Sequence, residues 1–421
     1  MEIGFIKFDE EALRRSRKVI KLLGGQGTID ELGLGRVRDA FSNTLFPGIS
    51  LLHTRAKYFL LLPALYEYLT SKEITGPRAA RQLVRDYEIR LTRRLKRGSL
   101  RGPDGKDPFG IIGSDFVADD PKDKSFVKYD PAYVYNVGLQ TYGLIPSGGN
   151  IYQILAEASR RRAQAPQRNI SQSDDIADDT GALSAERIRF GLCCRDYRFE
   201  DDDSPLDIRL DGEEAQFLSR EIQTHSDGSL LKYLIERDGD IGDKYGQTFD
   251  SLEPILSRDI PDTPLLKAYI LALRFSRFAL LLRTRYAILL NEASGAVSAS
   301  AERADSDSLY RQYDELLSKH AKDFAPDKIE EIIKFASGHK ANPIYYESFL
   351  REAAKYIFSG DMAALDEAIA RREIEVKSKR RSKLANPAGE KYFTPAEMNF
   401  RWPTVFTILG DLREGKGSFR S

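Results

Sequence analysis

The stretch that most constrains the fold is residues 262–292, DTPLLKAYILALRFSRFALLLRTRYAILLNE. Its apolar residues recur at helical spacing for about eight turns. Asp262 or Thr263 can cap the start, and Pro264 suits a first turn. The apolar face is wider than one stripe, so a helix here needs partners on several sides. The sequence therefore predicts a long central helix surrounded by other helices.

Most of the remaining chain also predicts helix. The segment 2–8 alternates enough for one short strand, and a helix follows Asp9. Further helices are expected over 35–46, 51–69, 77–98, 131–144, 150–164, 305–323, 326–337, 343–358, 361–380 and 395–413, the last interrupted by Pro403. The expected fold class is mainly α, with a short N-terminal strand and little sheet.

Residues 166–184, PQRNISQSDDIADDTGALS, have too few apolar side chains to order themselves well. We therefore expect two domains: a basic helical domain over 1–165, a polar linker over 166–184, and a helical domain over 185–421 that contains the central helix.

The net charge of zero is a sum of unlike segments. Residues 1–101 hold 20 basic and 11 acidic side chains (+9), residues 174–250 hold 9 and 21 (−12), and residues 371–401 hold 9 and 4 (+5). This segregation either steers a polyanionic partner to one end of the molecule or neutralises itself internally. On the predicted central helix, Lys267, Arg274, Arg277 and Arg285 fall within about 80° and form one basic stripe.

Location and redox state follow from what the sequence does not contain. The start, MEIGFIKFDEEALRRSRK, has no apolar signal core, and arginines break the longest apolar helix too often for a membrane span. The two cysteines, Cys193 and Cys194, are adjacent and unsuited to pairing with each other. We expect a cytoplasmic protein without membrane contact.

The search for catalytic motifs favours a nonenzymatic protein. Neither HExxH, paired CxxC, GxxxxGK[ST] nor GxSxG occurs in the chain, so no cofactor and no metal is expected. Glu375 and Lys377 form an E-x-K pair of the kind that holds a metal beside a scissile phosphate in nucleases. That motif needs a strand and a second acid, whereas this run predicts helix with only Asp361 or Asp366 nearby. A metal-dependent nuclease is therefore the alternative.

Basic clusters are the other candidate functional feature. RRLKRGSLR (93–101), RRR (160–162) and KSKRRSK (377–383) each lie near a predicted helix end or loop, where side chains can reach phosphates. Each cluster can equally be a solvated helix end. The residues of the first and third clusters that we expect to contact nucleic acid are Arg93, Arg94, Lys379, Arg380, Arg381 and Lys383.

A further pair of cations, Arg55 and Lys57, lies in the opening turns of LLHTRAKYFLLLPALYEYL (51–69). A buried charge needs a partner. One interpretation is a salt bridge from Arg55 to Asp30, Glu31 or Asp39. The other is that Arg55 and Lys57, aided by Arg36 and Arg38, hold a phosphate of DNA or of a nucleotide.

Three segments carry a resemblance to a known family. They are the opening IGFIKFDEEALRRSRKVIKLLGGQGTIDELGLGRVRDAFSNTLFPGISLLHTRAKYFLLLPALY, the helix LRFSRFALLLRTRYAILLNEA and the ending MNFRWPTVFTILGDL. Together they resemble an uncharacterised bacterial family, domain of unknown function 6361, with Phe5 and Lys7 where that family is expected to have Trp and Asp. The resemblance implies no assigned activity. It implies genes that resemble those of antiphage defence clusters.

From the residues and the resemblance together we expect a nonenzymatic, DNA-associated subunit of a bacterial antiphage defence system. Its partners would be DNA and other defence proteins, and its oligomeric state stays open. Besides the nuclease, a protein scaffold is an alternative, in which the acidic segment 174–250 binds basic partners.

Overall fold

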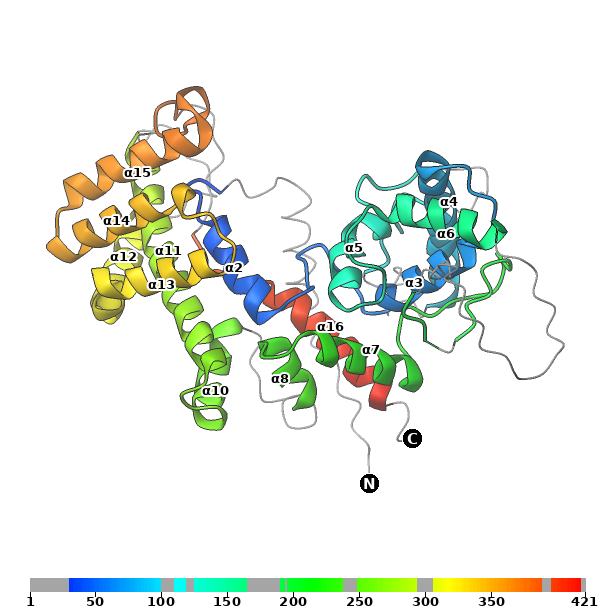
Figure 1. The fold of residues 1–421 in the computed structure, drawn as a ribbon. Coiled ribbons are helices and arrows are strands. Elements are labelled where there is room, and N and C mark those ends of the chain that lie inside the picture. Colours follow the sequence, from blue (N-terminus) through cyan, green and yellow to red (C-terminus); the bar gives the residue numbers. More distant parts are fainter. Residues whose placement is uncertain are drawn as a thin grey trace, which may run out of the picture. The chain divides into compact units, whose positions relative to one another are not determined.

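Helices form all the regular secondary structure that the computed structural model describes. The described residues are 30–99, 110–118, 125–164, 190–193, 195–237, 248–293, 306–387 and 395–417, and the elements within them are α-helices and short 3₁₀ helices (Figure 1). The mainly α-helical fold is therefore confirmed. The strand expected at 2–8 and the helix expected after Asp9 lie outside the described residues.

The chain divides into two compact units. Unit 1 consists of residues 1–45 and 242–403, and unit 2 of residues 46–241 and 404–421. This division differs from the two domains expected from the sequence, because residues on both sides of 166–184 fall in unit 2. That polar segment itself lies outside the described residues.

Unit 1 is built around the predicted central helix, α11 (Pro264–Ala293). Around it pack α2 (Gly35–Leu45), α12 (Ser306–His320), α13 (Pro326–Gly338) and α15 (Met362–Lys377), while α14 (Glu347–Ser359) packs on α13 and α15 (Figure 1). The shorter α10 (Glu253–Asp259) also contacts α11. The core includes Phe41, whose ring centroid lies 4.5 Å from that of Phe335 and 5.8 Å from that of Phe275. A helix covered on several sides is what the wide apolar face predicts.

The basic stripe on α11 is largely neutralised within unit 1. Arg285 makes two hydrogen bonds of 2.6 Å to the carboxylate of Asp366. Arg274 pairs with Glu331 at 2.9 Å, and Arg277 with Glu253 at 3.2 Å. Acids on the surrounding helices thus account for three of the four predicted cations, and the fourth, Lys267, is exposed.

Unit 2 contains α3 (Tyr58–Leu69), α4 (Pro77–Gly98), α5 (Pro131–Thr141), α6 (Ile151–Gln164), α7 (Gly212–His225) and α8 (Leu230–Glu236). Helix α3 contacts α4, α5, α6 and α7, so it forms the centre of this unit. Its Phe59 ring lies 4.9 Å from that of Tyr135, which in turn stacks on His53 at 4.3 Å. No helix was expected from the sequence over the stretches that form α7, α8 and α10.

Two boundaries differ from the sequence-based expectation. Arg55 lies in an irregular segment before α3, which begins only at Tyr58, and is therefore not in the first turns of a helix. The C-terminal helix α16 (Trp402–Gly417) begins later than expected and is not interrupted by Pro403. Proline at the second helical position is tolerated because the first backbone N–H groups of a helix have no partner within the helix.

Within the described part of the chain, none of the helices combines the length and the apolar character that a membrane crossing requires.

Candidate functional site

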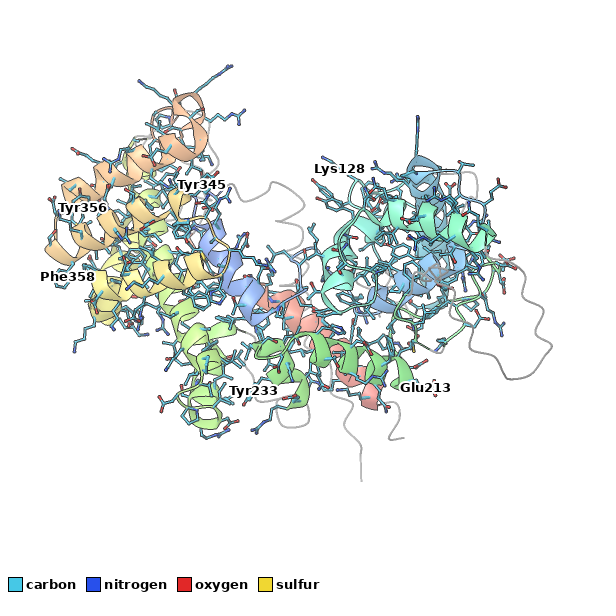
Figure 2. The ribbon with its side chains drawn as sticks, in the orientation of Figure 1. Lys128, Glu213, Tyr233, Tyr345, Tyr356 and Phe358 are labelled. Atoms are coloured by element: carbon cyan, nitrogen blue, oxygen red, sulfur yellow. The ribbon has the colours of Figure 1, made fainter. Side chains whose placement is uncertain are left out.

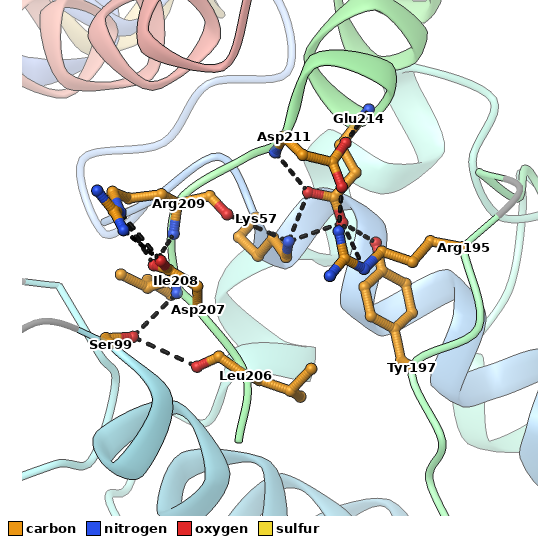
Figure 3. Close-up of polar contacts among 10 residues, drawn as sticks. All are labelled: Lys57, Ser99, Arg195, Tyr197, Leu206, Asp207, Ile208, Arg209, Asp211 and Glu214. Atoms are coloured by element: carbon orange, nitrogen blue, oxygen red, sulfur yellow. Dashed lines mark hydrogen bonds and ion pairs between the residues drawn. The ribbon is translucent and has the colours of Figure 1, made fainter. Parts of the chain in front are cut away.

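Lys57 lies at the centre of a buried polar network in unit 2, shown in Figure 3. Its Nζ atom lies 2.6 and 2.5 Å from the two carboxylate oxygens of Glu214 and 3.2 Å from the carbonyl oxygen of Arg209. Glu214 also accepts hydrogen bonds from the Tyr197 hydroxyl at 2.8 Å and from the backbone N–H of Asp211 at 2.9 Å. The three protons of the ammonium group therefore all have acceptors within the protein.

The electrostatics of this network are those of a buried ion pair. Burial lowers the pKa of Lys57, although the neighbouring Glu214 carboxylate acts in the opposite direction. Arg195 adds a second cation, 3.9 Å from Glu214, and forms an ion pair with Asp211 (Figure 3). With both ions withdrawn from water, each depends on the other for its stability. Lys57 is thus a structural residue in this arrangement, with no proton left for a phosphate.

Arg55 is held by a carboxylate of the same unit. Its Nε atom lies 2.9 and 3.0 Å from the two carboxylate oxygens of Asp411, and its Nη2 atom lies 2.8 Å from one of them. The backbone N–H of Ala56 donates to the same carboxylate at 2.7 Å. Burial disfavours the charge on Arg55, but Asp411 more than offsets this and raises the pKa of the guanidinium. The Arg55 side chain is 12% exposed, and the edge of its guanidinium group that carries Nε and Nη2 donates to Asp411.

The salt-bridge interpretation of Arg55 therefore named the wrong acids. Asp30 caps α2 by accepting from the backbone N–H of Leu34 at 2.9 Å. Glu31 pairs with Lys383 at 3.2 Å, and Asp39 pairs with Arg38 at 3.0 Å. Each of the three predicted partners is thus engaged within unit 1.

Arg93 and Arg94 also make structural contacts. Both side chains are buried on α4. Arg94 donates to the carbonyl oxygens of Tyr197 at 2.7 Å and Ser204 at 2.8 Å, and burial lowers its pKa. Arg93 donates to the carbonyl oxygen of Ala118 at 2.9 Å. These guanidinium groups tie loops of unit 2 to α4 rather than presenting charge to solvent.

The E-x-K pair lies on helix α15, where residues two apart point about 200° away from each other. Glu375 is 53% exposed and pairs with Arg372 at 3.2 Å. Lys377 instead forms ion pairs with Glu31 and, at 3.2 Å, with Glu373. Asp366 is engaged by Arg285, as described above. Among the residues that the structure describes, no three His, Cys, Asp or Glu side chains are grouped as a metal site would require.

Glu373 of unit 1 accepts several hydrogen bonds and is fully buried near the end of α15. It accepts hydrogen bonds from the hydroxyls of Tyr286 at 2.8 Å and Ser382 at 2.7 Å. It also accepts from the backbone N–H groups of Lys383 at 2.8 Å and Leu384 at 3.1 Å. These bonds fix the chain after α15 in one conformation, over residues 378–386, which we call the basic turn.

The basic turn presents three cations to solvent. Ser378 ends α15 with φ of 79°, and the short 3₁₀ helix η4 (Lys379–Arg381) follows. The side chains of Lys379, Arg380 and Arg381 are exposed and form no ion pair with any carboxylate in the described part of the chain. Lys383 differs from them, because it pairs with Glu31 at 3.2 Å. Of the eight basic residues that we expected to contact nucleic acid, only these three are exposed, while Arg160, Arg161 and Arg162 of the second cluster are exposed on α6 (Ile151–Gln164).

The sequence indicated Arg55 and Lys57 as candidate cations, but it did not indicate the acids with which they form ion pairs. Glu214 and Asp411 are far from their partners in sequence, and no local pattern pairs them. A usable pattern did exist for Glu214, since Asp211 and Glu214 have the spacing of a capping box, and both reciprocal bonds of that box form at the start of α7. Recognising it would have predicted α7.

Comparison with known proteins gives a family match over part of the chain. Residues 1–159 match the model of a family of unknown function, DUF6361. No curated protein and no solved structure matches the chain. The match confirms the resemblance for the N-terminal segment, and its description assigns no activity. The basic turn lies outside the matched residues.

The network around Lys57 gives a first prediction. Replacing Lys57 by Met should lower the free energy of unfolding by about 3–5 kcal/mol, because Glu214 is left buried without its counter-charge. Urea unfolding followed by circular dichroism measures this. The control is Lys72→Met, which removes a more exposed ion pair with Glu200 and should lower the free energy of unfolding far less. Equal losses in the two variants would contradict a buried pair.

A second prediction concerns the anchor of the basic turn. Replacing Glu373 by Gln removes the charged acceptor from the amides of Lys383 and Leu384. Hydrogen bonds to charged groups are worth about 1.5–3 kcal/mol, so these amides should exchange with solvent about 10- to 100-fold faster. Hydrogen exchange followed by mass spectrometry or NMR measures the rates. Glu375→Gln, on the exposed side of the same helix, is the control. Unchanged protection in Glu373→Gln would show that another contact holds the turn.

Proposed function

We propose that the basic turn binds the phosphate backbone of nucleic acid, and that the chain acts as a nonenzymatic, DNA-associated protein. One observation carries this proposal: three exposed cations, which have no acidic partner among the described residues, stand on a turn whose backbone is bonded to the buried carboxylate of Glu373. A cluster that served only the solubility of a helix end would not need a backbone fixed by so many hydrogen bonds.

The chemistry of the turn suits a polyanion. Lys and Arg that neutralise phosphates release the counterions condensed on a nucleic acid, which supplies most of the sequence-independent affinity. Arginine adds bidentate hydrogen bonding to phosphate oxygens. Because the backbone of the turn is already ordered, less conformational entropy is lost when these side chains bind.

The other predicted contacts support the proposal less well. Arg55, Lys57, Arg93 and Arg94 already have acceptors inside unit 2, and breaking those contacts to reach a phosphate would leave buried groups unsatisfied. The proposed interface therefore narrows from eight predicted residues to Lys379, Arg380 and Arg381. Lys383 lies next to them but shares its charge with Glu31.

The alternatives have weaker support from the geometry. The nuclease needs Glu375 on a metal and Lys377 beside the phosphate that the metal holds, yet the helix directs the two side chains apart. For the scaffold, the acidic segment would have to offer free carboxylates. In its described part Asp207 pairs with Arg209 at 2.6 Å and Asp211 pairs with Arg195, whereas Asp203 is exposed and forms no ion pair with a described residue, so the scaffold stays an alternative. Association with defence proteins stays a prediction from the family resemblance.

The basic turn predicts a salt-dependent affinity for duplex DNA. Replacing Lys379, Arg380 and Arg381 together by Ala should flatten the slope of log affinity against log salt by about 0.9 per lost phosphate contact, so by roughly 2–3. Fluorescence anisotropy at a series of salt concentrations measures the slope. The matched control replaces Lys319, Lys322 and Lys355, which are three exposed lysines of the same unit, by Ala. If the slope changes equally in both variants, the effect comes from net charge alone, which would contradict a specific interface at the basic turn.

We also predict that the purified chain binds DNA without hydrolysing it. Phosphoryl transfer needs stabilised charge on the phosphoryl group, supplied by clustered carboxylates with metal or by a phosphate-binding loop. The assay incubates the protein with plasmid, linear and single-stranded DNA, and with ATP, each with Mg²⁺ or Mn²⁺. The expected result is no turnover together with salt-sensitive binding. Turnover that Glu375→Ala abolishes, in a variant with an unchanged circular dichroism spectrum, would overturn the proposal in favour of the nuclease.

A further inference from the structure

Helix α5 of unit 2 presents an exposed aromatic surface. Its inner face is buried through residues such as Tyr135 and Leu139. On the opposite face Tyr133 is 61% exposed and Val137 is 66% exposed, and Tyr129, which precedes the helix, is 48% exposed. Residues four apart lie on the same side of a helix, so Tyr133 and Val137 are neighbours on this face. Large apolar side chains gathered at a surface often mark a binding site.

The two tyrosines form an ordered pair. Their ring centroids are 5.2 Å apart and their planes differ by 29°, which is a stacked arrangement. The Nζ atom of Lys128 lies 5.3 Å from the centroid of the Tyr129 ring. Figure 2 labels Lys128, whose side chain is exposed. Aromatic rings and a cation thus occupy one patch.

Two buried carboxylates hold this patch in place. Asp130 caps α5 by accepting from the backbone N–H of Tyr133 at 2.9 Å. The buried Glu88 of α4 accepts from the backbone N–H of Ala132 at 2.6 Å. Both side chains are buried, so the oxygens that accept from the helix amides face the protein interior rather than solvent. Among the described residues, the start of α5 therefore has a hydrogen-bonded backbone and no exposed acid beside the tyrosines and Lys128.

We propose that Tyr129 and Tyr133, with Lys128, form a stacking platform for the unpaired bases of single-stranded nucleic acid. Every base has a π face, so stacked tyrosines bind single strands with little sequence preference. The cation of Lys128 complements the phosphates that connect stacked bases. A second cation lies close by: the Arg85 guanidinium is 5.4 Å from the Phe126 ring centroid and donates to the carbonyl oxygen of Val127 at 3.4 Å. The positive charge favours a nucleic acid over an apolar protein partner.

This proposal goes beyond the function of the basic turn and does not depend on it. The platform belongs to unit 2 and would stack on bases, whereas the basic turn belongs to unit 1 and would contact phosphates. The two sites therefore have separate tests. Loss of duplex binding with retained stacking, or the reverse, would distinguish the failure of one from the failure of the other.

The test compares oligothymidylate of about 20 nucleotides, long enough for known single-strand site sizes, with an abasic oligonucleotide of equal length and charge. Fluorescence anisotropy is measured with the full chain, with Tyr129→Ser/Tyr133→Ser and with Tyr129→Phe/Tyr133→Phe. The serine variant should bind oligothymidylate about 10- to 100-fold more weakly, as base–aromatic stacking energies imply, while the phenylalanine variant keeps its affinity. All variants should bind the abasic strand equally.

Controls separate this role from folding and from net charge. Val137→Ser removes apolar surface from the same face without removing a ring, and it should leave oligothymidylate binding unchanged. Thermal unfolding of each variant checks that the fold is retained. If the serine variant binds oligothymidylate as tightly as the original chain does, or if the original chain does not prefer it to the abasic strand, the proposal is overturned. The second result would leave this face to a protein partner.

Discussion

The structure depends on the requirement that a buried carboxylate be satisfied by positive charge and hydrogen-bond donors. Glu214 in unit 2 and Glu373 in unit 1 each organise the residues around them. Removing such an ion from water costs several kcal/mol, so the surrounding donors have to be held in fixed positions. Glu214 draws Lys57 and Tyr197 together, and Glu373 draws the chain back over the end of α15. Each acid thereby connects the end of its helix to residues that are distant in sequence or that follow the helix.

The same requirement decides which cations can act on a partner. The sequence places 64 basic and 64 acidic residues in the chain, and their segregation could suggest large charged surfaces. Pairing removes many candidates: Arg285 is matched by Asp366, Arg55 by Asp411 and Lys57 by Glu214. Glu373 is instead buried beneath the basic turn, and Lys379, Arg380 and Arg381 form no ion pair within the described part of the chain. The cations that can act on a partner are thus those that are not paired inside the protein. Counting basic residues in the sequence does not identify them.

The reach of sequence reasoning follows from the same physics. Helix α11 could be predicted because its periodicity, cap and proline are local features. The ion pair of Arg55 could not be predicted, because its partner Asp411 is 356 positions away in sequence and only tertiary folding brings the two together. Acids close to Arg55 in sequence were named instead, and they are engaged elsewhere. The exposure of Lys379–Arg381 was partly predictable, since no acid interrupts residues 377–383, but its fixed backbone depends on the distant Tyr286 and on Glu373.

The conformation of Ser378 bears on whether the basic turn is incidental. With φ of 79° and ψ of 152°, this serine occupies a region that glycine adopts freely and that costs other residues about 1–3 kcal/mol. A helix end that only had to stop would relieve this cost with glycine, which is common at such positions. Here the strain persists because the bonds to Glu373 determine the path of the chain, and that path is what directs Lys379, Arg380 and Arg381 outward. The strain at Ser378 is maintained by the hydrogen bonds to Glu373, and the basic turn carries three exposed cations that form no ion pair with a described residue. Selection for this basic surface explains the strain more readily than selection for stability does.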